Sequence, residues 1–260
     1  MGGISFAMSG AADPHVSMPA PDLEPLFSAV TPVFLPEEEG HATGFYFVDD
    51  ANNPYLITNH HVVSGQNGNG SVRESIRVLS RTSEDLDDIT FHDVRLERDG
   101  EPTWITHPRG SSIDIVAVPL PFDPGAGAGV TFHSDMFPDP GQMPIAQRAM
   151  VVGYPMLERT PFLPLSRDAT IATLYGTTYR QLPCFLTDAD LHSGTSGSPV
   201  LALPRMSARD GDMLGRELNL IGVHSATIFA EHPPQEGALD LNVAWYAQLL
   251  KDMVTVEATQ

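Results

Sequence analysis

The stretch DADLHSGTSGSPV (188–200) places one serine hydroxyl, that of Ser196, among glycines and other small polar residues. Apolar runs flank it, PCFLT (183–187) before and VLAL (200–203) after, so a tight turn between two strands is expected here. A serine on such a turn can also attack a carbonyl carbon, but only where a base removes its proton and an acid orients that base. The chemistry therefore depends on a histidine and a carboxylate elsewhere in the chain.

The chain contains a candidate for each of these partners. The run YLITNHHVVSG is a short apolar strand that leads into a turn carrying His60 and His61. Asp114 stands in the otherwise apolar run SSIDIVAVPL, where a buried carboxylate is costly unless a partner such as a histidine compensates for it. Histidines and aspartates at strand ends are also common without any chemistry. Together with Ser196, however, these residues predict a Ser-His-Asp site.

The elements that must position these residues are expected to be strands. Short apolar runs bounded by Gly, Pro, Asn and Asp are typical of strands, and 23 Pro and 22 Gly suit a loop-rich β architecture. About half of the runs precede residue 130 and half follow it. The expected strands are 31–35, 43–48, 55–58, 75–79, 93–97 and 113–120, then 149–154, 169–175, 184–187, 199–203 and 218–226.

This pattern predicts an all-β protein with a double β-barrel and a C-terminal helix. The helix is expected over NVAWYAQLLKDMV (242–254), whose apolar residues have helical spacing behind an Asn242 cap. The expected segments are a flexible N-terminal arm (1–25), a first β-barrel with His61 and Asp114 (26–130), and a second β-barrel with Ser196 and the helix (131–255).

Composition limits the classes of partner and the compartment. The chain has 260 residues and a formal net charge of −19, which disfavours nucleic acid and an anionic membrane surface. No apolar run is long enough to span a bilayer. Cys184 is the single cysteine, so no internal disulfide can form, and the N-terminus lacks the features of a signal peptide. We therefore expect a cytoplasmic protein.

Three motifs resemble those of the trypsin/chymotrypsin-like serine peptidases, in particular the bacterial, disulfide-free branch that includes the high-temperature-requirement proteases. That group has T-N-x-H-V-V, D-[IL]-A and G-N-S-G-[GS]-P motifs, and this chain has TNHHVV (58–63), DIVA (114–117) and GTSGSP (194–199) in the same order. Weaker similarities follow the same family pattern and lie in ATGF (42–45), VGYP (152–155) and LIGVHS (220–225).

The resemblance implies a role for each matching residue. Ser196 would be the nucleophile, His61 the general base and then acid, and Asp114 the group that orients the imidazole. His61, not His60, matches the histidine before the two valines, so His60 is expected to pack or face solvent. The backbone N–H groups of Gly194 and Ser196 would form the oxyanion hole. The implied substrate is a protein or peptide, and no cofactor or metal is expected.

The same comparison leaves the cleavage specificity open. Asp190 lies six residues before Ser196, where an aspartate in trypsin-like enzymes selects Lys or Arg. His224, with His192 nearby, instead resembles the histidine with which glutamyl endopeptidases bind glutamate. Ser225 belongs to the strand that lies beside bound substrate in the family.

Regulation is also left open. Thr195 stands where the digestive enzymes have an aspartate that pairs with a newly cut N-terminus, so activation by clipping is not expected. Ordering of the loops 156–168 and 204–218 by a regulatory protein partner would be the alternative route. Two further hypotheses follow: an enzyme that is latent until activated by a partner, and a catalytically silent protease fold that binds peptides or acts as a scaffold.

Overall fold

The structure is a computed structural model of the chain, and it describes residues 25–36, 40–65, 73–81, 83, 85, 88–125, 130–157, 162–203, 218–230 and 237–254. The N-terminal arm expected over 1–25 lies outside the described residues except for Pro25. The loop 156–168 is described in part, and of the loop 204–218 only the last residue is described. No helix within these ranges is long and apolar enough to cross a lipid bilayer.

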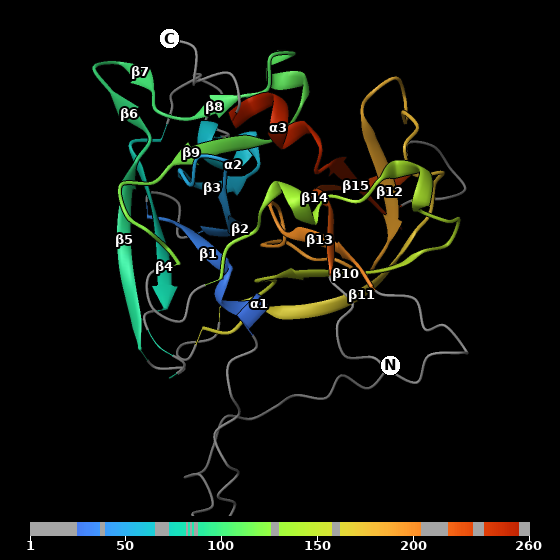
Figure 1. Cartoon of the computed structure of the whole chain (residues 1–260), viewed down its shortest axis with the longest axis horizontal. Helices are drawn as coiled ribbons and strands as arrows, with labels where there is room; N and C mark the ends of the chain where they lie inside the picture. The colour runs from blue at the N-terminus through green and yellow to red at the C-terminus, as the bar shows by residue number, and fades with distance from the viewer. Residues whose placement is uncertain are drawn as a thin grey trace, which may run out of the picture.

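The first half of the chain forms one antiparallel sheet that curves into a half-barrel, drawn in blue to green in Figure 1. Its strands lie in the order β5-β4-β1-β2-β3-β9-β8 among the described residues, and β6 and β7 form a separate hairpin. The strands are β1 (Val30–Leu35), β2 (Gly40–Val48), β3 (Pro54–Thr58), β4 (Ser75–Arg81), β5 (Ile89–Arg95), β6 (Glu97–Arg98), β7 (Glu101–Pro102), β8 (Ile105–Thr106) and β9 (Val116–Pro119).

The second half of the chain forms a closed antiparallel barrel, in the order β10-β11-β12-β15-β14-β13 (Figure 1). Its strands are β10 (Arg148–Gly153), β11 (Leu165–Ile171), β12 (Cys184–Asp188), β13 (Pro199–Ala202), β14 (Asn219–Ala230) and β15 (Gly237–Tyr246). The predicted all-β fold, a chymotrypsin-like double barrel with a C-terminal helix, is thereby confirmed, although the first unit is an open half-barrel.

The helices are few and short in the described part of the chain. They are α1 (Pro25–Ser28), α2 (His60–Ser64) and α3 (Leu249–Val254), with single 3-10 turns at Gly110–Ser112, Ser134–Met136 and Pro140–Gln142. The predicted helix over 242–254 is wrong in its first part, because residues through Tyr246 belong to β15. β15 pairs with both β12 and β14, so closing the barrel requires a strand where the local periodicity favoured a helix.

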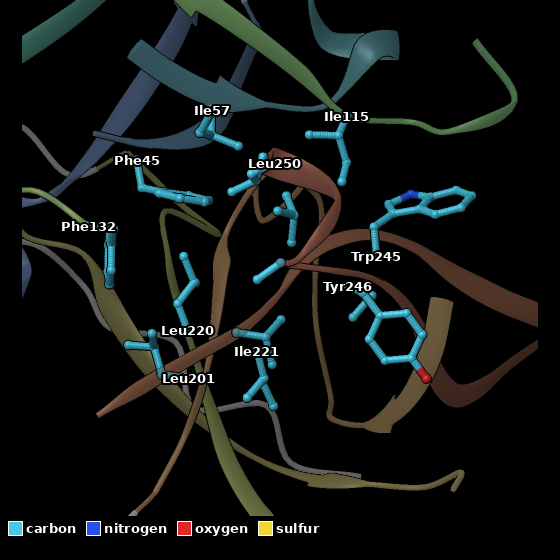
Figure 2. Close-up of a cluster of buried hydrophobic side chains, with 14 of the residues drawn as sticks. Phe45, Ile57, Ile115, Phe132, Leu201, Leu220, Ile221, Trp245, Tyr246 and Leu250 are labelled. Atoms are coloured by element: carbon cyan, nitrogen blue, oxygen red, sulfur yellow. The ribbon is translucent and has the colours of Figure 1, made fainter. Parts of the chain in front are cut away.

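Two apolar clusters account for the packing. One fills the half-barrel with residues such as Tyr46 and Ile76. The other fills the closed barrel and continues into the junction between the two halves, where Phe45 and Ile57 from the first sheet face Leu220 of β14 (Figure 2). Burying a large apolar side chain contributes about 1.5–3 kcal/mol, so this shared cluster stabilises one half against the other.

Strand alternation decides which side of β2 faces which cluster. Ala42 and Tyr46 point into the half-barrel, whereas Phe45 and Phe47 belong to the shared cluster. Thr43 therefore lies on the side that faces the second barrel, because successive side chains of a strand point to opposite faces. This places a polar residue of the first sheet at the junction of the two halves.

Candidate active site

His61 and Asp114 are brought together by two connections of the first sheet. His61 lies on α2, directly after β3, and Asp114 precedes β9, which pairs with β3. The His61 Nδ1 atom is 2.8 Å from Asp114 Oδ2, and the His61 backbone N–H donates to Asp114 Oδ1 at 2.9 Å. The Asn59 side chain adds a hydrogen bond to the Asp114 carbonyl oxygen at 2.7 Å. The two candidates are thus fixed relative to each other at three points.

The surroundings of Asp114 determine its charge and the tautomer of His61. Burial raises the pKa of the Asp114 carboxyl, but hydrogen bonds from His61 and from the Ser225 hydroxyl outweigh burial and hold the pKa below its usual range. The Ser225 Oγ–H donates to Asp114 Oδ2 at 2.6 Å. An ionised carboxylate only accepts, so the proton of a neutral His61 lies on Nδ1 and Nε2 keeps a free lone pair. His61 is therefore arranged to act as a base through Nε2.

Ser196 lies in the connection between β12 and β13, as the sequence predicts. Its Oγ–H donates to the backbone carbonyl of Ser225 at 3.1 Å. Ser225 therefore links Ser196 to Asp114: its carbonyl accepts the hydrogen bond from Ser196, and its hydroxyl donates to Asp114. Within the described residues, the Ser196 hydroxyl makes no other hydrogen bond. In the part of the chain that the structure describes, no hydrogen bond joins the Ser196 hydroxyl to His61.

The turn before Ser196, which we call the Gly194 turn (residues 192–195), has the features of a type II turn. The Thr195 N–H donates to the His192 carbonyl at 3.3 Å, and Gly194 has a φ of +95°. A type II turn needs a positive φ at its third residue, which favours glycine there. A side chain at Gly194 would also overlap the Tyr154 carbonyl oxygen. The sequence places glycine where both backbone conformation and space require it.

The residues predicted to set specificity occupy two different environments. Burial lowers the pKa of His224 to about 4, with His61 as a further cause, so its ring is neutral at neutral pH. The His224 Nδ1 atom is buried and has no hydrogen-bond partner among the described residues. Asp190, by contrast, has a side chain that is 68% exposed, and its carboxylate pairs with Arg167 at 3.1 Å. His192 is exposed, and its Nδ1 lies 4.0 Å from Asp190 Oδ1.

The remaining candidates are placed simply. His60 packs edge-on against Trp104, with ring centroids 6.4 Å apart, which agrees with the expected packing role. In the described ranges, no three His, Cys, Asp or Glu side chains are grouped so that they could hold a metal ion.

The fold and this arrangement define a class of protein. A double β-barrel that gathers a serine, a histidine and an aspartate at the junction of its halves is a serine peptidase fold. The trypsin-like peptidase domain matches residues 42–204, more than half of the chain, and the chain belongs to this family. The protein is a serine endopeptidase, which confirms the predicted family and enzyme class.

Comparisons with individual proteins agree with this fold. No curated protein matches the chain. Among solved structures, the thermostable serine protease AL20 from an extremophilic microorganism is 11% identical, with a TM-score of 0.54 over 90% of this chain and 99% of that one. An inactive form of the Rv3671c protease from M. tuberculosis H37Rv is 17% identical, with a TM-score of 0.47 over 90% and 88%. At such identities the first likeness shows the fold, and the second carries no argument.

Sequence reasoning missed two contacts of the site. It assigned Ser225 to substrate binding, and the hydrogen bond from its hydroxyl to Asp114 joins two residues that lie 111 positions apart. It treated Thr43 as part of a strand motif only, although Thr43 contacts the connection that carries Ser196. The one available signal for Thr43 was its place in the ATGF motif (42–45).

Proposed function

We propose that Ser196, His61 and Asp114 hydrolyse peptide bonds through an acyl-enzyme. The Ser196 Oγ forms a bond to the substrate carbonyl carbon while its proton passes to His61 Nε2. His61 then donates that proton to the leaving amine as the C–N bond breaks. Water attacks the acyl-enzyme by the same steps in reverse and releases Ser196. Throughout the cycle, Asp114 holds the His61 ring and stabilises its positive charge.

The observation that carries this proposal is the set of hydrogen bonds around Asp114. Three donors on one partly buried carboxylate, two of them from His61, leave Nε2 as the free nitrogen of the ring. A structural ion pair would not require the ring to keep one nitrogen free beside a serine-bearing turn. The Gly194 turn supports the proposal further, because the N–H groups of Gly194 and Ser196 are the expected donors to the oxyanion.

The position of the Ser196 hydroxyl favours a resting state over a permanently active one. Its bond to the Ser225 carbonyl must break before His61 can accept the proton. We propose that substrate, or a regulatory protein partner that orders nearby loops, releases the hydroxyl from Ser225. The same bond is the observation that favours the second candidate, a catalytically silent protease fold that binds peptides. We also propose a cytoplasmic location, because the single cysteine of the sequence, Cys184, is buried and free.

Labelling with a fluorophosphonate probe tests the proposal, since the probe reacts only with an activated serine. The wild-type protein and the Ser166→Ala control, which removes an exposed hydroxyl on β11, should be labelled, and Ser196→Ala should not. Labelling in lysate of the native host but not of the purified protein would support latency. A folded wild-type protein that is labelled in neither setting would refute the enzymatic proposal and leave the binding module.

Specificity is tested by a peptide library on the same preparation. We propose two alternatives from the sequence, basic selectivity through Asp190 and glutamate selectivity through His224 with His192. The exposed pairing of Asp190 with Arg167 weakens the first. The buried Nδ1 of His224, which has no hydrogen-bond partner among the residues that the structure describes, supports the second. Loss of glutamate preference in His224→Gln, with Asp190→Asn unchanged, would decide between them.

A further inference from the structure

We propose that Thr43, a residue of the first sheet, is a positioning residue for the oxyanion hole in the second barrel. This inference rests on the proposed function, because it assigns a role within the same reaction. Thr43 is fully buried on β2, on the side of that strand that faces the second barrel. Its role follows from what its hydroxyl and backbone bind.

The Thr43 hydroxyl bridges two segments of the second half. It donates to the Gly194 carbonyl at 2.7 Å and accepts the Tyr154 backbone N–H at 2.9 Å. A hydroxyl has one donor and two acceptor positions, so a single oxygen can serve both bonds. Valine has the same shape and can make neither bond. The hydroxyl of Thr43 is therefore needed for these two hydrogen bonds and not for filling space in the core.

The backbone of Thr43 binds Ser196, the residue that follows Thr195. The Thr43 N–H donates to the Ser196 carbonyl at 2.9 Å, and the Thr58 hydroxyl donates to the Thr43 carbonyl at 2.8 Å. Of the two carbonyls held by Thr43, that of Gly194 lies between the two expected oxyanion donors along the chain, and that of Ser196 directly follows the second donor. Two N–H groups converge on one oxygen only if the peptide between them is fixed, and Thr43 fixes it.

Tyr154 completes the support beneath the turn. Its N–H is bound by Thr43, and its carbonyl accepts a hydrogen bond from His41 Nε2 at 2.9 Å. The Tyr154 carbonyl lies directly against Gly194, where even a methyl group would overlap it. Losing the Thr43 hydroxyl would therefore release the Gly194 turn and the peptide on which it rests at the same time.

The test compares three variants of the full chain. Thr43→Val removes the hydroxyl, Thr43→Ser keeps it, and Thr31→Val is the matched control. Thr31 is also fully buried, and its hydroxyl also accepts a backbone N–H, from Leu79, and donates to a carbonyl, that of Pro32. A displacement of about 1 Å at a reacting centre costs about 10²-fold in rate. We expect kcat of Thr43→Val to fall about 10²-fold with little change in KM, and Thr43→Ser and Thr31→Val to stay within about 3-fold of wild type.

Two readouts separate positioning from a loss of stability. A peptide aldehyde, which forms an oxyanion on Ser196, should bind Thr43→Val more weakly by the same factor as kcat/KM falls. The unfolding temperatures of Thr43→Val and Thr31→Val should be lowered alike. Equal kcat values for these two variants, or unchanged aldehyde affinity in Thr43→Val, would overturn the proposal.

A measurement without turnover keeps this proposal distinct from the enzymatic one. The ¹³C shift of the Gly194 carbonyl should change in Thr43→Val and stay unchanged in Thr31→Val, because only Thr43→Val removes the hydrogen bond to this carbonyl. If the wild-type protein is inactive and does not react with the fluorophosphonate probe, but Thr43→Val still moves the Gly194 signal, only the proposed function is refuted. An unmoved Gly194 signal in Thr43→Val would refute the role of Thr43, whatever the activity.

Discussion

The substitution Gly194→Ala tests whether the Gly194 turn is needed for activity as well as for backbone conformation. A Cβ at this position would lie 2.5 Å from His41 Nε2 and closer still to the Tyr154 carbonyl oxygen, whereas ordinary contacts begin at 3.4 Å. Tyr154 is held at both its N–H and its carbonyl, so the Gly194 turn must move, by about 1 Å. Losing one oxyanion donor typically costs about 10²–10³-fold in kcat, or about 2.7–4 kcal/mol. We expect a loss of this size in Gly194→Ala.

The matched control for this prediction is Gly100→Ala. Gly100 has a φ of +85°, close to the +95° of Gly194, but a Cβ there meets no atom within 4 Å. Both substitutions carry the strain of a left-handed alanine, about 1–2 kcal/mol, and both should lower the melting temperature by a few degrees. Only Gly194→Ala should slow fluorophosphonate labelling. Wild-type labelling by Gly194→Ala, or an equal loss in Gly100→Ala, would refute the assignment of the turn.

Three further predictions concern charge. In Asp114→Asn, an amide facing His61 favours the wrong tautomer, so kcat should fall about 10⁴-fold at neutral pH, and a fall of less than tenfold would contradict the role of Asp114. Burial lowers the pKa of His224 to about 4, whereas in the unfolded state this histidine binds a proton near pH 6.5. The free energy of unfolding should therefore be highest above pH 6.5. It should fall by about 3 kcal/mol as the pH falls toward 4. Urea unfolding at several pH values should show this loss in the wild type and not in His224→Gln. Asp190→Asn should change the preference for Lys or Arg by less than about 3-fold, and stability by about 0–1 kcal/mol, because its carboxylate is exposed and paired with Arg167; a collapse of basic selectivity in the peptide library would show the opposite.

The strands and the three candidate residues were predictable because each has a local signal. Apolar runs between turn residues predicted most of the strands. His61, Asp114 and Ser196 each lie in a short motif of four to six residues that can be recognised by itself. The error at 242–246 has a physical cause. Residues of β15 satisfy a helical periodicity locally, but the barrel between β12 and β14 is open without them, and tertiary pairing outweighs local propensity.

The contacts that join distant segments could not be predicted from one sequence. Asp190 sits at the spacing of a specificity residue, yet nothing nearby in the chain reveals that Arg167 on the adjacent strand binds it. The hydroxyl of Thr43 reaches Gly194 across 151 positions, and no local pattern records that reach. Side-chain partners across two barrels depend on register and on the docking of the halves, which only the folded chain specifies.

The place of β15 in the barrel has a consequence for synthesis. Among the described residues, β12 and β14 do not pair with each other; each pairs with β15, the last strand that the structure describes. A ribosome-bound chain that has already exposed His61, Asp114 and Ser196 therefore still lacks a closed second barrel. After β15 emerges, α3 follows and packs onto β8 and β9, against the half that was made first (Figure 1). We therefore expect the second barrel, and with it the surroundings of Ser196, to be completed only after β15 has been synthesised.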